Sequence, residues 1–149
     1  QKGTSTYEKW QDQVIDFHKD GKLEWGAVWM LIYPNIMVEW YPQTIVVSTL
    51  YPLEAQKTLN ITEFYYAEEI ALFNEEYVQS QKEAYMETAK EDDEIAERME
   101  QGKQSLRIEN KLNPNFLHPT LEKGIPEFYR YLKKNSSTSL RKKYFEPSV

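Results

Sequence analysis

The feature that most limits the possible folds is a stretch of about 35 residues, Ala67 to Gln101, without glycine or proline. This stretch is acidic and rich in strong helix formers, and Gly102 directly after it is a typical C-terminal helix stop. We therefore predict one helix over about residues 67–102. At 1.5 Å per residue such a helix is roughly 50 Å long, which is enough to cross a whole sheet.

Four strand-like runs precede this helix, and Pro-containing turn signals separate them. The runs cover residues 28–33, 36–41, 44–51 and 58–66. Within the second run Ile36, Val38 and Trp40 fall on one side of a strand, and the residues between them fall on the other. We predict an α+β fold in which an antiparallel meander packs on the long C-terminal helix, because a sheet with one apolar face needs a covering layer.

The ends of the chain carry weaker signals. Trp10, Val14 and Phe17 have helical spacing and predict a short helix over 7–17 that ends near Asp20-Gly21. Pro126, at a helix-start position, predicts a second short helix over about 125–133. We expect residues 1–134 to form one domain portion and residues 135–149 to form a basic tail, either mobile or bound to another subunit.

Composition and charge exclude several classes of protein. Apolar residues make up 40% of the chain and charged residues 28%, which argues against disorder, and no apolar run approaches the roughly 20 residues that span a membrane. Residues 1–102 carry 8 Lys/Arg against 20 Asp/Glu, so the body is too acidic to favour nucleic acid. The lack of cysteine and of a visible signal peptide predicts a cytoplasmic protein.

Asp92 breaks the pattern of the long helix. At 100° per residue it falls in the centre of an apolar stripe that includes Tyr85, Ala89, Ala96 and Met99. A buried carboxylate is costly unless it is paired, protonated or bound to a metal. Two simpler interpretations stay open: a tyrosine hydroxyl, an arginine or backbone amides satisfy the carboxylate, or the sheet ends before residue 92 and leaves it exposed.

The segment from Glu91 to Arg98, followed by Gly102, resembles a signature of the catalytic domain of Rieske non-haem iron oxygenase α subunits. That signature is Glu-Asp, two variable residues, an aliphatic, a small residue or Cys, Glu-Arg, and Gly four positions later. The resemblance extends over roughly residues 26–134 and includes Tyr33 to Met37, Tyr51-Pro52, Glu122 to Gly124 and Glu127-Phe128.

This resemblance implies a helix-grip fold of the Bet v 1/START type and a mononuclear Fe(II) held by two histidines and one carboxylate. Asp92 matches the carboxylate position. The resemblance further implies a [2Fe–2S] Rieske domain, a reductase or ferredoxin, a homotrimer, and O₂-dependent hydroxylation or demethylation of a small organic substrate.

The chain departs from the family in its histidines and its lack of cysteine. His18 and His118 are too far apart to match the paired iron ligands, and we interpret them as a surface and a loop residue. Without cysteine the chain cannot hold a Rieske cluster. We therefore expect the two histidines and the cluster to lie outside this chain, which would be the C-terminal part of a longer oxygenase or a truncated relative.

Other candidate sites are less specific. We expect Val38, Trp40, Val47 and Ile61 to help line a substrate pocket. Aromatic strand residues such as Trp29, Tyr41 and Tyr65 suit either core packing or a cage for a quaternary ammonium group. The helical carboxylates lack the spacing of a calcium loop and indicate a solvated face. Two alternatives to an oxygenase remain: a ligand-binding helix-grip module without metal, and a remnant that folds only by pairing with another chain.

Overall fold

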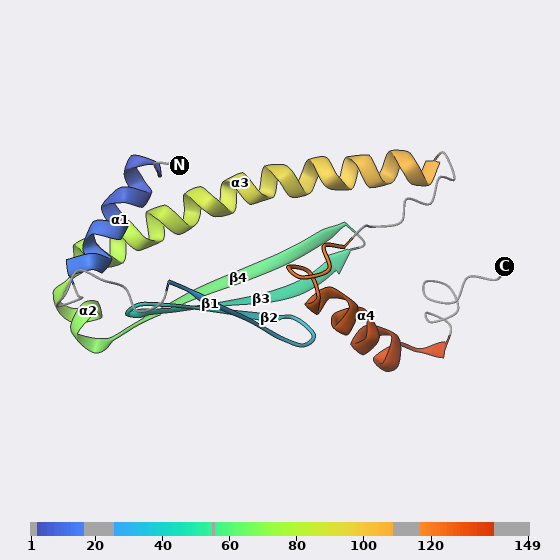
Figure 1. Ribbon diagram of the computed structural model, residues 1–149, viewed down its shortest axis with the longest axis horizontal. Helices are drawn as coiled ribbons and strands as arrows, with labels where there is room; N and C mark the ends of the chain where they lie inside the picture. Colours follow the sequence, from blue (N-terminus) through green and yellow to red (C-terminus); the bar gives the residue numbers. More distant parts are fainter. Residues whose placement is uncertain (1–2, 17–25, 55, 109–116, 139–149) are drawn as a thin grey trace.

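The computed structural model describes residues 3–16, 26–54, 56–108 and 117–138 (Figure 1). The elements follow in the order α1 (Ser5–Asp16), β1 (Val28–Ile32), β2 (Ile36–Tyr41), β3 (Thr44–Glu54), β4 (Lys57–Tyr66), α2 (Glu68–Phe73), α3 (Glu75–Ile108) and α4 (Gly124–Asn135). The predicted α+β class, with a four-stranded sheet and one long helix, is therefore confirmed.

The sheet is the antiparallel meander that the sequence predicts, with strand order β1-β2-β3-β4. Residues Pro42 and Gln43 form the tight turn between β2 and β3, and Gln43 has a positive φ of 63°. A non-glycine residue rarely adopts this conformation. Here neighbouring elements hold the turn, since the Tyr77 hydroxyl of α3 donates to the Pro42 carbonyl oxygen at 2.7 Å.

The two faces of the sheet differ in what covers them. Thr44, Val46 and Ser48 of β3 are buried on the face toward α3. On the other face Trp40 is 48% exposed and Ile61 is 45% exposed. Alternation therefore divides the sheet as predicted, with α3 running along one face for the length of the sheet (Figure 1).

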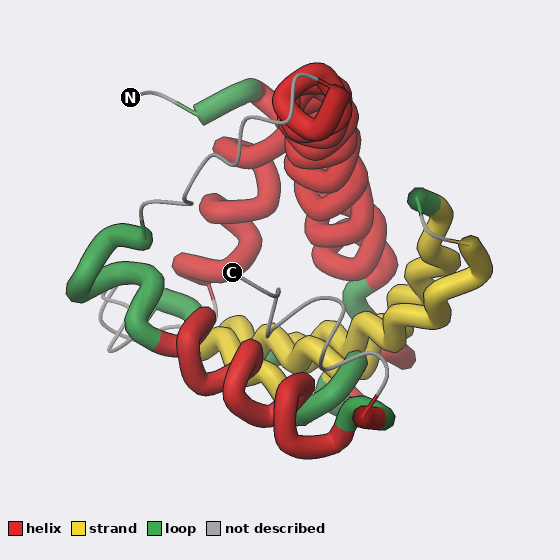
Figure 2. The backbone as a smooth tube through the Cα atoms, turned by 90° about the vertical axis from the view of Figure 1, so that its right-hand side faces the viewer, coloured by secondary structure: helices red, strands yellow, loops and turns green. Residues whose placement is uncertain are grey.

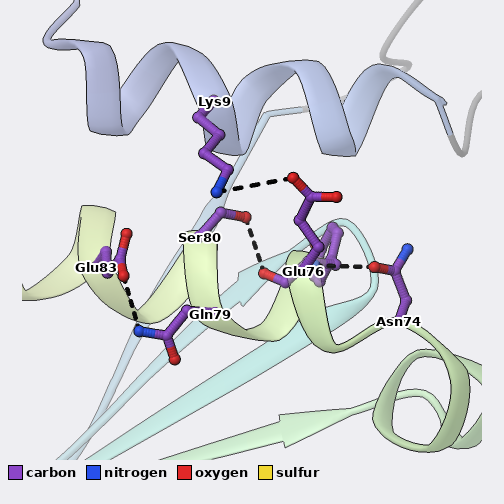
Figure 3. A network of polar contacts seen from close by, with 7 residues as sticks. Lys9, Asn74, Glu76, Gln79, Ser80 and Glu83 are labelled. Atoms are coloured by element: carbon purple, nitrogen blue, oxygen red, sulfur yellow. Dashed lines mark hydrogen bonds and ion pairs between the residues drawn. The ribbon is translucent and has the colours of Figure 1, made fainter.

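The long helical stretch begins later and ends later than the sequence predicts. Residues 68–73 form a separate short helix, and Asn74 interrupts it. The Asn74 Oδ1 atom accepts a hydrogen bond from the Tyr77 backbone N–H at 2.9 Å, which caps the start of α3 (Figure 3). At the other end α3 continues through Gly102 to Ile108, because one glycine costs a helix only about 1 kcal/mol and good helix formers follow it.

The best-buried core lies where α1, α2 and the start of α3 meet. Val14 of α1, Ile70 of α2 and Tyr77 of α3 form it, and Trp10 and Tyr66 pack against it. An ion pair between Lys9 Nζ and Glu76 Oε1, 3.7 Å long, joins α1 to α3 at the surface above this core (Figure 3). The predicted N-terminal helix is therefore real and covers the first part of α3.

Helix α4 packs at the opposite end of the molecule. The ring of Tyr33, in the β1–β2 turn, lies 5.3 Å from that of Phe128 and 5.0 Å from that of Tyr131. Figures 1 and 2 both place α4 on the side of the sheet away from α3. The short helix predicted over 125–133 is confirmed, while the basic tail and the Asp20-Gly21 turn lie mostly or wholly outside the described residues. None of the described helices is long and apolar enough to span a membrane.

Candidate functional site

A cavity of about 630 Å³ lies between α3, α1 and the helix-facing side of the sheet. This size is typical of sites that bind small molecules, which occupy roughly 300–1,000 Å³. Its walls come from α1 (Tyr7, Trp10, Gln11, Val14, Ile15), from the sheet and its flanks (Gly26, Ala27, Trp29, Met37, Glu39, Tyr41, Pro42, Asn60) and from α3 (Gln81, Ala84, Tyr85, Thr88, Ala89, Asp92, Asp93).

Glu39 is the charged residue on the sheet wall of this cavity. It lies on β2 opposite Trp29 of β1 and Val46 of β3, and this register places it on the face toward α3. Its Oε2 atom accepts hydrogen bonds from Trp29 Nε1 (3.1 Å) and the Tyr41 hydroxyl (2.5 Å), and its Oε1 atom accepts one from the Tyr85 hydroxyl (3.2 Å). Residues from two strands and from α3 thus hold the Glu39 carboxylate in place.

Tyr85 connects α3 to the sheet beside this carboxylate. Its hydroxyl lies 3.4 Å from Ser48 Oγ, and its ring packs edge-on against Phe64 with centroids 5.1 Å apart. Burial is the main cause that raises the pKa of Tyr85, and burial together with the Glu39 carboxylate raises the pKa of Tyr41. Both hydroxyls therefore stay protonated at neutral pH and serve as hydrogen-bond donors.

Asp92 lines the same cavity from α3, but its side chain is exposed. Of the interpretations that the sequence leaves open, the exposed one is therefore what the described residues show, and the buried one is wrong. The sheet and its turns contact α3 in two places. Tyr77 and Tyr85 make the first contact, in the first half of the helix, and Gln56 Nε2 makes the second by donating to Glu100 Oε1 at 3.2 Å. Asp92 lies between these two contacts, beside the open cavity. Because it is exposed to solvent, its carboxylate does not need a metal ion to offset a cost of burial.

The buried stripe of α3 also differs from the predicted one. Its buried residues are Tyr77, Ser80, Gln81 and Ala84, because α1 and the sheet flank the first half of the helix from two sides. Farther along, Ile95 is 48% exposed and Met99 is 57% exposed. The apolar residues around Asp92 thus form a stripe on α3, but no other described element packs over this stripe.

The four strand residues expected in the substrate pocket lie on the other face of the sheet. Val38 pairs with Val47, Trp40 pairs with Ile45 and Ile61 pairs with Thr49. These cross-strand pairs alternate with the pairs whose side chains face α3, so they point to the opposite face. None of Val38, Trp40, Val47 and Ile61 lines the cavity. Alternation separates the two faces correctly, but it does not say which face meets the helix, so these four residues lie on the face away from the cavity.

The histidines do not complete a metal site within the part of the chain that the structure describes. His118 is exposed, and its Nδ1 atom accepts backbone N–H groups of Thr120 (3.3 Å) and Leu121 (3.1 Å), as suits a loop residue. His18 lies outside the described residues. Among the described residues no group of three or more His, Cys, Asp or Glu side chains is placed to hold a metal ion, so these residues alone do not fit an iron centre.

The family model for the ring-hydroxylating α subunit, catalytic domain, matches residues 1–137. The chain belongs to this oxygenase family. Ring-hydroxylating oxygenases are oxidoreductases that use mononuclear iron and a Rieske cluster, and they depend on electron-transfer partners. The resemblance seen in the Glu91–Arg98 segment is therefore confirmed at the level of the family.

Two relatives in the family are putrescine 2-hydroxylases. The one from Bordetella bronchiseptica is 42% identical over 134 residues, which is 90% of this chain and 31% of that protein. The one from Ralstonia nicotianae is 46% identical over 132 residues, which is 89% of this chain and 36% of that protein. The chain thus spans about a third of the length of these relatives, and no solved structure matches it.

Glu39 is a charged cavity residue that the sequence-based prediction of the site missed. The signal was present, because Glu39 is a carboxylate between Val38 and Trp40 in a run that is otherwise apolar and aromatic. A charged residue inside such a strand breaks its local pattern as clearly as Asp92 breaks that of the helix.

Proposed function

We propose that this chain is the C-terminal portion of the catalytic domain of an O₂-dependent hydroxylase that acts on a small aliphatic amine. In the whole protein Asp92 is the carboxylate ligand of Fe(II), and the two histidine ligands come from residues outside this chain. The observation that carries the proposal is that Asp92, in the family signature, lines a cavity of small-molecule size.

The charge of the cavity supports an amine as substrate. Among the described residues that line it, the charged side chains are Glu39, Asp92 and Asp93, and none is a lysine, arginine or histidine. Such an acidic lining disfavours an anionic substrate and favours a cationic one. Putrescine, named in the two relatives, is a diamine that carries two positive charges at neutral pH.

The chain's own contribution is to bind and orient the substrate. Tyr41 and Tyr85 position a carboxylate on the sheet wall, while Ala84, Ala89 and Met37 provide apolar surface for an alkyl chain. In the whole protein, bound iron would supply the activation of O₂, and the Rieske cluster with a reductase or ferredoxin would supply the electrons. We further expect a homotrimer, as the family resemblance implies.

The test is hydroxylation of putrescine by the full-length protein with its iron and cluster in place. The reaction balances when one oxygen atom of O₂ enters a C–H bond and the other leaves as water, with two electrons and two protons consumed. With ¹⁸O₂ we expect one labelled oxygen per product molecule by mass spectrometry, and no product from iron-depleted protein. Binding of putrescine without any oxidation by the loaded protein would instead support the non-catalytic binding module.

A further inference from the structure

We infer that Glu39 is the residue that binds an ammonium group of the substrate, an inference that rests on the proposed amine hydroxylase. Asp92 belongs to the family signature, but nothing in that signature assigns a role to Glu39. In this role Glu39 determines which substrate the cavity selects, since iron chemistry alone does not distinguish an amine from a neutral molecule of the same size.

The hydrogen bonds of Glu39 leave room for a ligand. An ionised carboxylate has about four lone-pair positions. Trp29 Nε1 and the Tyr41 hydroxyl use Oε2, whereas among the described residues Oε1 receives only the Tyr85 hydroxyl. The three donors are neutral and fix the carboxylate, and Oε1 keeps one acceptor position for a further N–H group.

The charge of Glu39 has no partner among the ion pairs that the described residues form. Glu39 is partly buried and lies on the wall of a cavity, where an uncompensated carboxylate costs more than it does at the surface. An ammonium group compensates this charge and donates to the carboxylate at the same time. A neutral ligand does neither.

The surroundings of Glu39 suit a cation as well. The rings of Trp29 and Tyr41 meet edge-on with centroids 6.5 Å apart, and the ring of Trp10 meets that of Tyr41 at 5.6 Å. Aromatic faces attract ammonium groups, and they replace part of the hydration that the group loses on binding. The cavity thus places a carboxylate among aromatic side chains at the sheet wall.

Glu39 lies on β2 and Asp92 lies on α3, so the two carboxylates line the cavity from two different elements. An elongated amine held by one ammonium group at the sheet extends its alkyl chain toward the helix. This orientation presents a carbon of the chain, rather than the bound nitrogen, to the side that carries the signature aspartate.

The experiment compares putrescine binding to the full-length protein and to its Glu39→Gln variant by calorimetry, without reductant. The amide keeps the size of the side chain and removes its charge. A hydrogen bond to a charged group contributes about 1.5–3 kcal/mol, so we expect Kd to rise by about 10- to 100-fold. Glu63→Gln is the matched control, because Glu63 is also a strand glutamate with a tyrosine partner, Tyr65, but lies on the outer face.

Each outcome decides the inference. Weaker binding in Glu39→Gln together with unchanged binding in Glu63→Gln supports it. Unchanged binding in Glu39→Gln overturns it while leaving the hydroxylase proposal in place, since the wild-type protein still oxidises the amine. If the loaded wild-type protein neither binds nor oxidises putrescine or a related amine, the proposed substrate class and the role of Glu39 both fail.

A second comparison does not depend on how the variant folds. The wild-type protein is titrated with putrescine and with 1,4-butanediol, which has the same carbon chain and no charge. We expect the diol to bind at least about tenfold more weakly, because it cannot compensate the carboxylate. Equal affinity for the two compounds overturns the inference.

Discussion

Tyrosine side chains make most of the polar contacts between α3 and the sheet. Tyr77 is fully buried and its hydroxyl reaches the Pro42 carbonyl oxygen and Thr44 Oγ1, while Tyr85, about two turns farther along α3, reaches Ser48 and Glu39. A buried polar group that loses its partner costs more free energy than the bond itself contributes. At this scale, therefore, the position of α3 over the cavity depends on a few hydroxyl groups.

Replacing Tyr77 with Phe tests this dependence. The change removes the donor to the Pro42 carbonyl oxygen at 2.7 Å and leaves that oxygen buried without it. We expect the free energy of unfolding, measured in urea, to fall by about 1–3 kcal/mol. Tyr51→Phe, at an exposed tyrosine, is the control and should stay within about 0.5 kcal/mol of wild type. Equal stability of the two variants would contradict this role of Tyr77.

The partly buried Tyr66 also predicts a loss of stability at high pH. Burial, with a smaller contribution from Tyr77, raises the pKa of Tyr66 to about 12, above the value of about 10 for an unfolded chain. An unfolded chain then releases this proton first, so the stabilisation is complete below pH of about 10 and is lost as pH rises toward about 12. We expect the free energy of unfolding to fall over this pH range, and to fall less steeply in the Tyr66→Phe variant. The same slope of unfolding free energy against pH in both proteins would contradict this role of Tyr66.

At the scale of elements, α3 shows which helix signals are decisive. Asn74 ends α2 and caps α3 through the Tyr77 backbone N–H, so a polar residue inside an apparently continuous helical stretch divides it in two. Gly102 does not end the helix, although it occupies a typical stop position. A cap acts through a specific hydrogen bond, whereas one glycine only weakens a helix that its neighbours still favour.

Gly102→Ala tests whether Gly102 is an ordinary helix residue. A Cβ atom at Gly102 meets nothing within 4 Å, so the substitution adds helix propensity without a clash. We expect the end of α3 to gain about 0.5–1 kcal/mol, seen as slower hydrogen exchange of amides around residue 102. Gly26→Ala, outside the helices and equally open, is the control and should leave exchange in α3 unchanged. Faster exchange in Gly102→Ala would contradict the observed helix.

For the whole molecule, periodicity predicts the class, the strand order and the helices, because each depends on local spacing. The site is harder to predict. The signature identifies Asp92. The exposure of that residue depends on the distance between the sheet and α3 near residue 92, and the spacing of residues along the sequence does not predict that distance. Choosing Val38, Trp40, Val47 and Ile61 for the pocket failed to find the cavity wall for a similar reason, since the inner face is decided by the tyrosine contacts of α3.

Iron content tests the central claim, that this cavity belongs to an iron oxygenase with Asp92 as a ligand. Asp92→Ala and Asp93→Ala are made in the full-length protein, and iron is measured together with the absorption of the Rieske cluster. Both residues line the cavity, so they differ chiefly in the role that the signature gives to Asp92. We predict that Asp92→Ala loses its mononuclear iron and keeps its cluster, and that Asp93→Ala keeps both. Full retention of mononuclear iron in Asp92→Ala would contradict the account.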